Sequence, residues 1–147
     1  MSAGPRVHEA ALLAQARRAQ AAAYAPYSRL RVGCALQTAD GRIFSGANVE
    51  SAAYPAGLCA ERAALGAAVA AGAREFAALV LVADGPGPCP PCGVCRQALV
   101  EFAPDLPVVA AGADGALGRY VLGRDLLPDA FDASRLPGRP GAPPPPG

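Results

Sequence analysis

The chain has 147 residues, of which 52% are hydrophobic and 17% charged, so the composition favours one globular domain and excludes a largely disordered protein. Thirteen basic side chains, all of them Arg, face 12 acidic ones for a net charge of +1, which argues against a nucleic-acid partner. The apolar runs are much shorter than the roughly 20 residues that cross a bilayer, so we expect no membrane partner and a cytoplasmic protein.

The first half of the chain predicts a helix, a β-hairpin and a second helix. Ala, Leu, Gln and Arg at helical spacing indicate the first helix over 7–24, and Pro26 ends that pattern. Apolar residues alternate with polar ones on both sides of Asp40-Gly41, which is typical of a hairpin with a tight turn. After a loop over 48–58, strong helix formers predict a helix over 59–71 that ends at Gly72.

The second half predicts alternating strands and helices. The run 76–83 is apolar at nearly every position, as in a central strand covered on both faces. A helix over 93–103, strands over 107–111 and 119–122 and a short helix over 124–127 follow. This order predicts parallel crossovers and a layered α/β domain over 1–136, followed by a disordered Pro/Gly-rich tail over 137–147.

Three of the five cysteines are placed to bind one metal ion. Cys59 begins one predicted helix, and Cys92 and Cys95 lie on one face of the first turn of the next. Zinc suits three thiolates, and a missing fourth protein ligand leaves a position for water, which is typical of a catalytic site. Glu61 follows Cys59 closely enough to carry protons at the open side. We further expect hydrogen bonds to the thiolates from Arg62 and Gln97, which would offset their negative charge.

These motifs resemble those of the zinc-dependent cytidine deaminases. The resemblance rests on Cys59-Ala60-Glu61-Arg62 and on Pro91-Cys92 followed by Cys95-Arg96-Gln97, and it extends from Tyr24 to Phe131, nearly the whole chain before the tail. The chain is similar to the short, three-cysteine form of the family, which assembles as a homotetramer. The implied fold is a three-layer α/β/α sandwich with a mixed, mostly parallel central sheet.

The resemblance implies a reaction and a cofactor. One zinc ion per chain, held by the three cysteines, would activate water for attack on C4 of a cytosine ring. Glu61 would protonate N3 and then the departing amino group. The products would be ammonia and uridine or deoxyuridine, from cytidine or deoxycytidine, as in pyrimidine salvage.

The resemblance also assigns substrate contacts. By position, Asn48 and Glu50 would hold the ribose hydroxyls, and a carboxylate at Glu50 would repel a phosphate, which favours nucleosides over nucleotides. Leu30 replaces a base-stacking Phe found in many relatives. The remaining contacts are the backbone of Ala60, at the base edge, and Tyr54 and Phe131, which would close the pocket of a neighbouring subunit.

Two alternatives remain open from the sequence. A relative that deaminates a cytosine-nucleoside antibiotic such as blasticidin S would use the same metal motif. A binding module with a closed structural zinc site would need a fourth ligand, for which Cys34 and Cys89 are the candidates. Cys34 is more simply a core residue, and Tyr54 and Phe131 are equally compatible with plain subunit packing.

Overall fold

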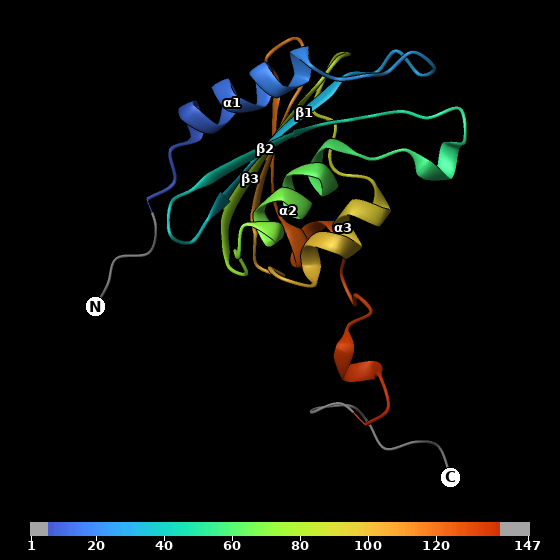
Figure 1. Ribbon diagram of the computed structural model, residues 1–147. Coiled ribbons are helices and arrows are strands. Elements are labelled where there is room, and N and C mark those ends of the chain that lie inside the picture. The colour runs from blue at the N-terminus through green and yellow to red at the C-terminus, as the bar shows by residue number, and fades with distance from the viewer. Residues whose placement is uncertain (1–5, 139–147) are drawn as a thin grey trace.

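The computed structural model describes residues 6–138, which form one five-stranded sheet with helices on both faces (Figure 1). The strands are arranged in the order β2-β1-β3-β4-β5, so the apolar β3 is central, as predicted. Their bounds are β1 Val32–Thr38, β2 Ile43–Ala47, β3 Phe76–Ala83, β4 Pro107–Ala111 and β5 Leu117–Val121.

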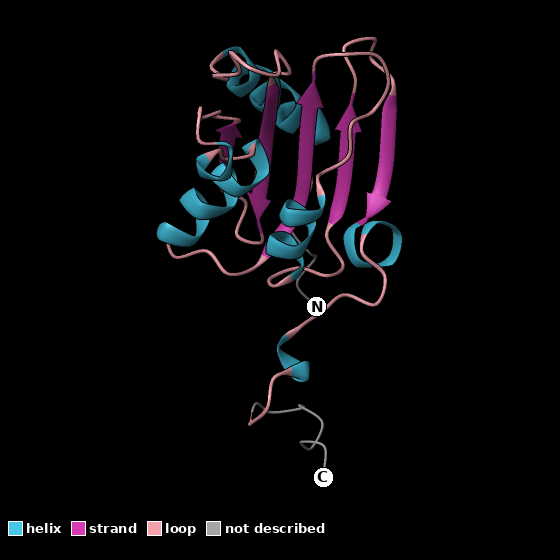
Figure 2. Cartoon of the chain, turned by 90° about the vertical axis from the view of Figure 1, so that its right-hand side faces the viewer, coloured by secondary structure: helices cyan, strands magenta, loops and turns pink. Residues whose placement is uncertain are grey.

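Three helices complete a three-layer arrangement, as predicted. α1 (Glu9–Ala21) covers one face of the sheet, and α2 (Ala60–Ala70) and α3 (Gly93–Val100) cover the other (Figure 2). The side chains of β3 alternate between the two cores: Leu79 and Leu81 pack on the α2 and α3 side, whereas Val80 and Val82 pack on the α1 side. A strand buried on both faces explains why its sequence is apolar throughout.

The sheet is mixed, as expected, but the expectation that it is mostly parallel is wrong. Only β3 and β4 pair in parallel, and the other three neighbouring pairs are antiparallel. The reason is the hairpin: β1 lies between β2 and β3, so the crossover through α2 joins two strands that run in the same direction without touching. Element order along the chain predicts crossovers but does not say which strand lies between them.

The two helices that carry the cysteines begin at the same edge of the sheet. Gly33, near the start of β1, pairs with Ala47 at the end of β2 and with Val82 near the end of β3. The chain therefore leaves β2 toward α2, and β3 toward α3, from adjacent positions. This register brings together side chains that lie more than 30 residues apart in the sequence.

Gly46 on β2 allows the start of α2 to approach the sheet closely. A Cβ at this position would overlap the backbone of Ala60 and Ala64 in α2. The first turn of α2, which follows Cys59, is thus seated directly on the strand. This contact fixes the position of the residues around Cys59 relative to the sheet.

The chain after β5 first packs against the domain, with Leu122 and Leu126 buried in the core, and then leaves its body. Leu122–Leu126 form one turn of π-helix where a short helix over 124–127 is predicted, and Ala133–Arg135 form a 3-10 turn. The segment with Phe131 and Leu136 extends away from the sheet (Figure 1). Most of the predicted tail, from residue 139 onward, lies outside the described residues. Among residues 6–138, no helix combines the length and apolar character that a membrane crossing requires.

Candidate active site

The three predicted ligands meet at the starts of α2 and α3. The sulfur atoms of Cys59, Cys92 and Cys95 all lie within 4.8 Å of one another, and the Sγ atoms of Cys59 and Cys92 are 3.8 Å apart. Cys59 and Cys92 are the residues that immediately precede the two helices, and Cys95 is in the first turn of α3. Three converging soft thiolates suit zinc, so the donor set fits one Zn²⁺ per chain.

The helix starts bear on the ionisation of Cys92. Burial raises the pKa of this thiol, but the backbone N–H groups of Cys95 and Val94, together with the Cys95 and Cys59 thiols, outweigh it and lower the pKa overall. Backbone N–H groups at the start of a helix favour a thiolate because they point positive charge at the sulfur. The first turn of α3 is therefore a suitable place for a metal-binding cysteine.

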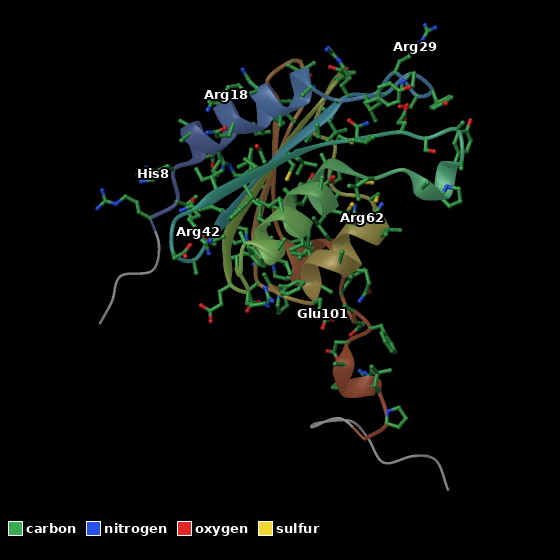
Figure 3. The ribbon with its side chains drawn as sticks, in the orientation of Figure 1. His8, Arg18, Arg29, Arg42, Arg62 and Glu101 are labelled. Carbon is green, nitrogen blue, oxygen red and sulfur yellow. The ribbon has the colours of Figure 1, made fainter. Side chains whose placement is uncertain are left out.

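Arg62 adds a positive charge beside the sulfurs. Its Nη2 donates to Cys59 Sγ at 3.7 Å, and the Cys59 and Cys95 sulfurs raise the pKa of the guanidinium. Figure 3 shows sulfur atoms grouped next to Arg62, between α2 and α3. This is the geometry expected of a side chain that offsets the negative charge of the thiolates.

Glu61 is buried beside the metal ligands. Its side chain is 4% exposed, and burial raises the pKa of its carboxyl despite opposing contributions from its own backbone, from Arg62 and from the Cys95 thiol. A carboxyl with a raised pKa can hold and release a proton closer to neutral pH than an exposed one. Glu61 lines the same pocket as Cys59 and Cys92, so its proton is available to a molecule bound there.

Within the described residues, the cluster of metal-ligating side chains comprises three cysteines and excludes the two proposed fourth ligands. Cys34 is fully buried in the core on the α2 side. Cys89 lines the pocket with Cys92 but is outside the cluster. The arrangement matches an open, catalytic zinc site better than a closed structural one.

The pocket at these residues has a volume of about 260 Å³, and a second hollow of about 310 Å³ adjoins it through Asn48, Glu50 and Cys59. Leu30, Ala60 and Glu61 belong to the inner pocket, and Tyr54 belongs to the outer hollow. The residues that the sequence assigned to the metal, the base and the ribose are thus brought together. The combined space is in the range of a small-molecule site.

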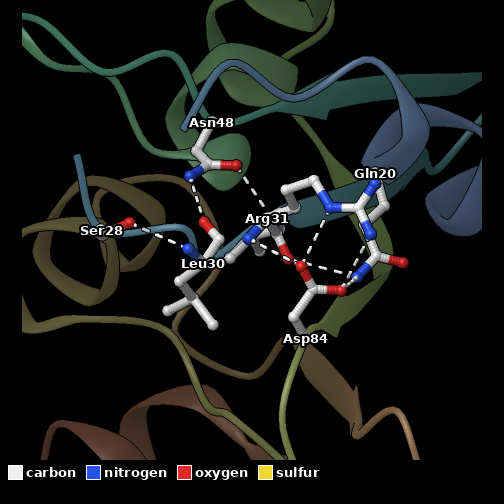
Figure 4. Close-up of polar contacts among 7 residues, drawn as sticks. Gln20, Ser28, Leu30, Arg31, Asn48 and Asp84 are labelled. Carbon is white, nitrogen blue, oxygen red and sulfur yellow. Dashed lines mark hydrogen bonds and ion pairs between the residues drawn. The ribbon is translucent and has the colours of Figure 1, made fainter. Parts of the chain in front are cut away.

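Asn48 and Glu50 both bind the loop that precedes β1. The Asn48 amide accepts from the Val32 N–H and donates to the Leu30 carbonyl, both at 2.8 Å (Figure 4). Glu50 Oε1 accepts from the backbone N–H groups of Tyr27 and Ser28 at 2.9 and 3.1 Å. Hydrogen bonds from Ser28 and Tyr27 lower the pKa of Glu50, which therefore stays ionised at neutral pH.

Tyr54 and Phe131 are exposed, at 75% and 59% respectively. The Tyr54 ring meets Tyr27 edge to face, with ring centroids 6.1 Å apart. Phe131 lies on the segment that leaves the body, outside the residues that line the pocket of its own chain. Both positions are compatible with the predicted contact to a neighbouring subunit, which stays a prediction.

Gln97 differs from its prediction. Its Nε2 donates to the carbonyl of Phe131 at 2.8 Å, and no thiolate contact of Gln97 is among the hydrogen bonds of the described residues. Its position in α3 directs the side chain toward the C-terminal segment. Gln97 therefore anchors Phe131 rather than the metal ligands.

Sequence reasoning gave no role in the pocket wall to Cys89 or Pro90, and none to the backbone groups that bind Glu50. Cys89 and Pro90 line that wall, and Tyr27 and Ser28 hold Glu50 through backbone groups. Backbone donors carry no sequence signal, so only the Cys-rich run 89–95 gave any indication of these contacts.

Comparisons with known proteins agree with this geometry. Residues 6–111 match the family model described as the cytidine and deoxycytidylate deaminase zinc-binding region. A cytidine deaminase of Sporosarcina psychrophila is 43% identical over 126 residues, covering 85% of this chain and 92% of the relative. A cytidine deaminase of Mycobacterium tuberculosis is 42% identical over 130 residues, covering 86% of this chain and 91% of the relative.

Solved structures show the same likeness. The crystal structure of cytidine deaminase from Burkholderia pseudomallei has a TM-score of 0.81 and 48% sequence identity. The match covers 85% of this chain and 100% of that one. The cytidine deaminase from Mycobacterium tuberculosis has a TM-score of 0.73 and 39% identity, covering 86% and 98% of the two chains. The fold, the three clustered cysteines and the extent of these matches lead to one conclusion: the chain belongs to the cytidine and deoxycytidylate deaminase zinc-binding family.

Proposed function

We propose that this chain hydrolyses cytidine and deoxycytidine to uridine and deoxyuridine, with release of ammonia. The observation that carries the proposal is the buried Glu61 in one pocket with the sulfur cluster. The curated relatives, which are named cytidine deaminases, support the same activity. They favour it over an antibiotic deaminase and over a non-catalytic zinc module.

Cys59, Cys92 and Cys95 would hold the zinc ion. When bound, it supplies the Lewis acidity that makes water nucleophilic at neutral pH. Arg62 reduces the negative charge of the sulfurs through its contact with Cys59. The chain itself therefore provides both the binding site and the charge balance.

Glu61 would carry the protons. Deamination adds water across C4 and N3 of the cytosine ring and then expels the amino group, so one proton must reach N3 and another must reach the leaving nitrogen. A single carboxyl that faces both atoms can deliver each in turn. Burial of Glu61 raises its pKa, so the carboxyl carries a proton near neutral pH more often than an exposed one does.

Asn48 and Glu50 would hold the sugar. Glu50 accepts both of its loop hydrogen bonds through Oε1, and Asn48 keeps one amide hydrogen and one lone pair after binding Leu30 and Val32. An ionised Glu50 accepts from a sugar hydroxyl but repels a phosphate. We therefore assign nucleosides, and not nucleotides, to this pocket.

The complete site would require a homotetramer. Tyr27, Val49, Tyr54 and Leu58 are large exposed side chains that line the outer hollow, and Phe131 is exposed on the segment that leaves the body. Such a surface favours burial against another copy of the chain. We place the enzyme in the cytoplasm and in pyrimidine salvage, where a reducing environment keeps three cysteines available for zinc.

The test is a substrate panel on zinc-loaded protein. Cytidine and deoxycytidine are expected to give uridine and deoxyuridine with equimolar ammonia, while cytidine monophosphate and blasticidin S are poor substrates. Glu61→Gln is expected to keep its zinc and lose about 10²- to 10⁴-fold in kcat, because it removes the proton carrier. Zinc-replete protein that turns over none of the nucleosides would overturn the proposal.

A further inference from the structure

The loop that precedes β1 places Leu30 in the wall of the pocket. Hydrogen bonds to both backbone groups of Leu30 hold the loop in position. The Leu30 N–H donates to Ser28 Oγ at 3.0 Å, and the Leu30 carbonyl accepts from Asn48 at 2.8 Å. Arg29, just before it, has a φ of 60°, a left-handed conformation that a non-glycine residue adopts at some cost. A costly backbone conformation persists only where the surrounding contacts hold it.

A second set of contacts fixes the other side of Leu30, through Arg31. Asp84, the residue after β3, accepts from the Arg31 backbone N–H at 3.2 Å and from Arg31 Nε at 3.0 Å through the same Oδ2 atom. The Asp84 N–H also donates to the Arg31 carbonyl at 3.1 Å. Asp84 therefore binds the backbone N–H, the backbone carbonyl and the guanidinium of Arg31 (Figure 4).

Gln20 of α1 joins these two residues from the opposite face of the sheet. Its Nε2 donates to the Arg31 carbonyl at 3.2 Å and to Asp84 Oδ1 at 3.1 Å. The guanidinium of Arg31 lowers the pKa of Asp84, so the carboxylate remains ionised at neutral pH. Hydrogen bonds between an ionised donor and an ionised acceptor are stronger than neutral ones.

We propose that Asp84 is a positioning residue for substrate binding, which fixes Leu30 against the base through Arg31. The inference rests on the proposed deaminase function. Leu30 lines the inner pocket with Glu61 and Cys59, whereas Asp84 is not among the residues that line it. Asp84 thus acts on the substrate through the loop and not by contact.

The consequence for kinetics is specific. An apolar wall packs equally against the base in the bound substrate and in the transition state, so misplacing it weakens uniform binding. Asp84→Ala is therefore expected to raise KM for cytidine about fivefold with kcat changed less than about twofold. The inhibition constant of uridine, which needs no turnover, is expected to rise by a similar factor.

Two further variants separate positioning from mere folding. Asp84→Asn keeps an oxygen that can accept from Arg31 and is expected to give a KM between those of the wild type and Asp84→Ala. In a Leu30→Ala background, Asp84→Ala is expected to have almost no additional effect on KM, because the wall it positions is already gone. The matched control is Asp40→Ala, which removes the comparable Arg42–Asp40 pair at the far edge of the sheet and should leave KM unchanged.

The outcomes are distinct. A lower melting temperature with unchanged KM and unchanged uridine inhibition would show that Asp84 only stabilises the fold, and equal effects with and without Leu30 would show that it acts by another route. Either result overturns the inference while the deaminase activity stands. If Asp84→Ala does not fold, Arg31→Ala, which removes only the guanidinium contacts, is expected to raise KM in the same direction. Wild-type protein without cytidine turnover would instead overturn the proposed function.

Discussion

The inner end of the pocket, where the three cysteines meet Glu61, is built from the first turns of two helices seated on the sheet. The outer end is built from loops and from side chains such as Tyr54, which is largely exposed. The inner end has its ligands within 4.8 Å of one another in a single chain. At the outer end, Phe131 does not reach the pocket of its own chain.

This difference separates two requirements of the proposed reaction. Metal binding and proton transfer need groups held to a fraction of an ångström, which rigid helix starts provide. Closure over a substrate needs groups that admit and release it, which exposed loops provide. Substitutions at the two ends should therefore change different quantities.

The largest effect is expected at the inner end. Cys92→Ser should abolish deamination, because it removes a metal ligand. It should lower zinc affinity by more than the roughly 100-fold that is lost when a residue hydrogen-bonded to a ligand is replaced. Cys89→Ser, in the same pocket wall but outside the sulfur cluster, is the matched control and should keep its zinc. Metal content by atomic absorption checks both, and loss of zinc from Cys89→Ser would favour a closed four-cysteine site instead.

A smaller effect is expected at the outer end. Phe131→Ala should raise KM for cytidine about tenfold and leave zinc content unchanged, because in the proposed assembly it removes the aromatic side chain that closes a neighbouring subunit's pocket. Leu117→Ala, at another exposed apolar side chain on β5, should leave KM unchanged.

A mixing experiment tests whether Phe131 serves a neighbouring subunit. Glu61→Gln and Phe131→Ala chains, co-expressed so that they assemble together, should form some sites with an intact Glu61 and a neighbour's intact Phe131. Those sites should show the wild-type KM. If mixed protein has only the high KM of Phe131→Ala, the two ends of the pocket belong to one chain.

The smallest effect is expected far from both ends, at the hairpin turn. Hydrogen bonds from Thr38 and Arg42 lower the pKa of Asp40 to about 2, below its ordinary value of 3.8. A carboxyl with a lowered pKa stabilises the fold at pH values above its ordinary pKa. That contribution is lost as the pH falls from about 4 to about 2. Asp40→Asn should therefore lose less stability than the wild type over this range in denaturant titrations, with no change in cytidine KM. An equal loss in both proteins would contradict the assignment.

The inner end could be predicted from the sequence, because its signal is local. Cys92 and Cys95 lie one helical turn apart, and Cys59 and Glu61 lie two residues apart at the start of α2. Only the convergence of the two helices had to be inferred. It follows because β2 and β3 have their carboxyl ends on the same side of the sheet. The same inference survives the wrong expectation of a mostly parallel sheet, because β2 and β3 point the same way with β1 between them.

The surroundings of the pocket could not be predicted in the same way. Gln97 is near the metal ligands in the sequence, but its side chain turns toward Phe131, since proximity on a helix does not fix direction. Arg31 and Asp84 are 53 positions apart and meet only because β1 pairs with β3. No composition or spacing marks such a pair before the register of the sheet is known.

The pocket lies at the carboxyl ends of β2 and β3, so the loops at the opposite ends of these strands are far from it. Within residues 6–138, the connections at the opposite edge, such as the Asp40-Gly41 turn, contribute no residue to either part of the pocket. Lengthening a connection there costs little entropy and displaces no ligand. That turn is the natural place to graft a reporter peptide or a surface anchor onto the enzyme.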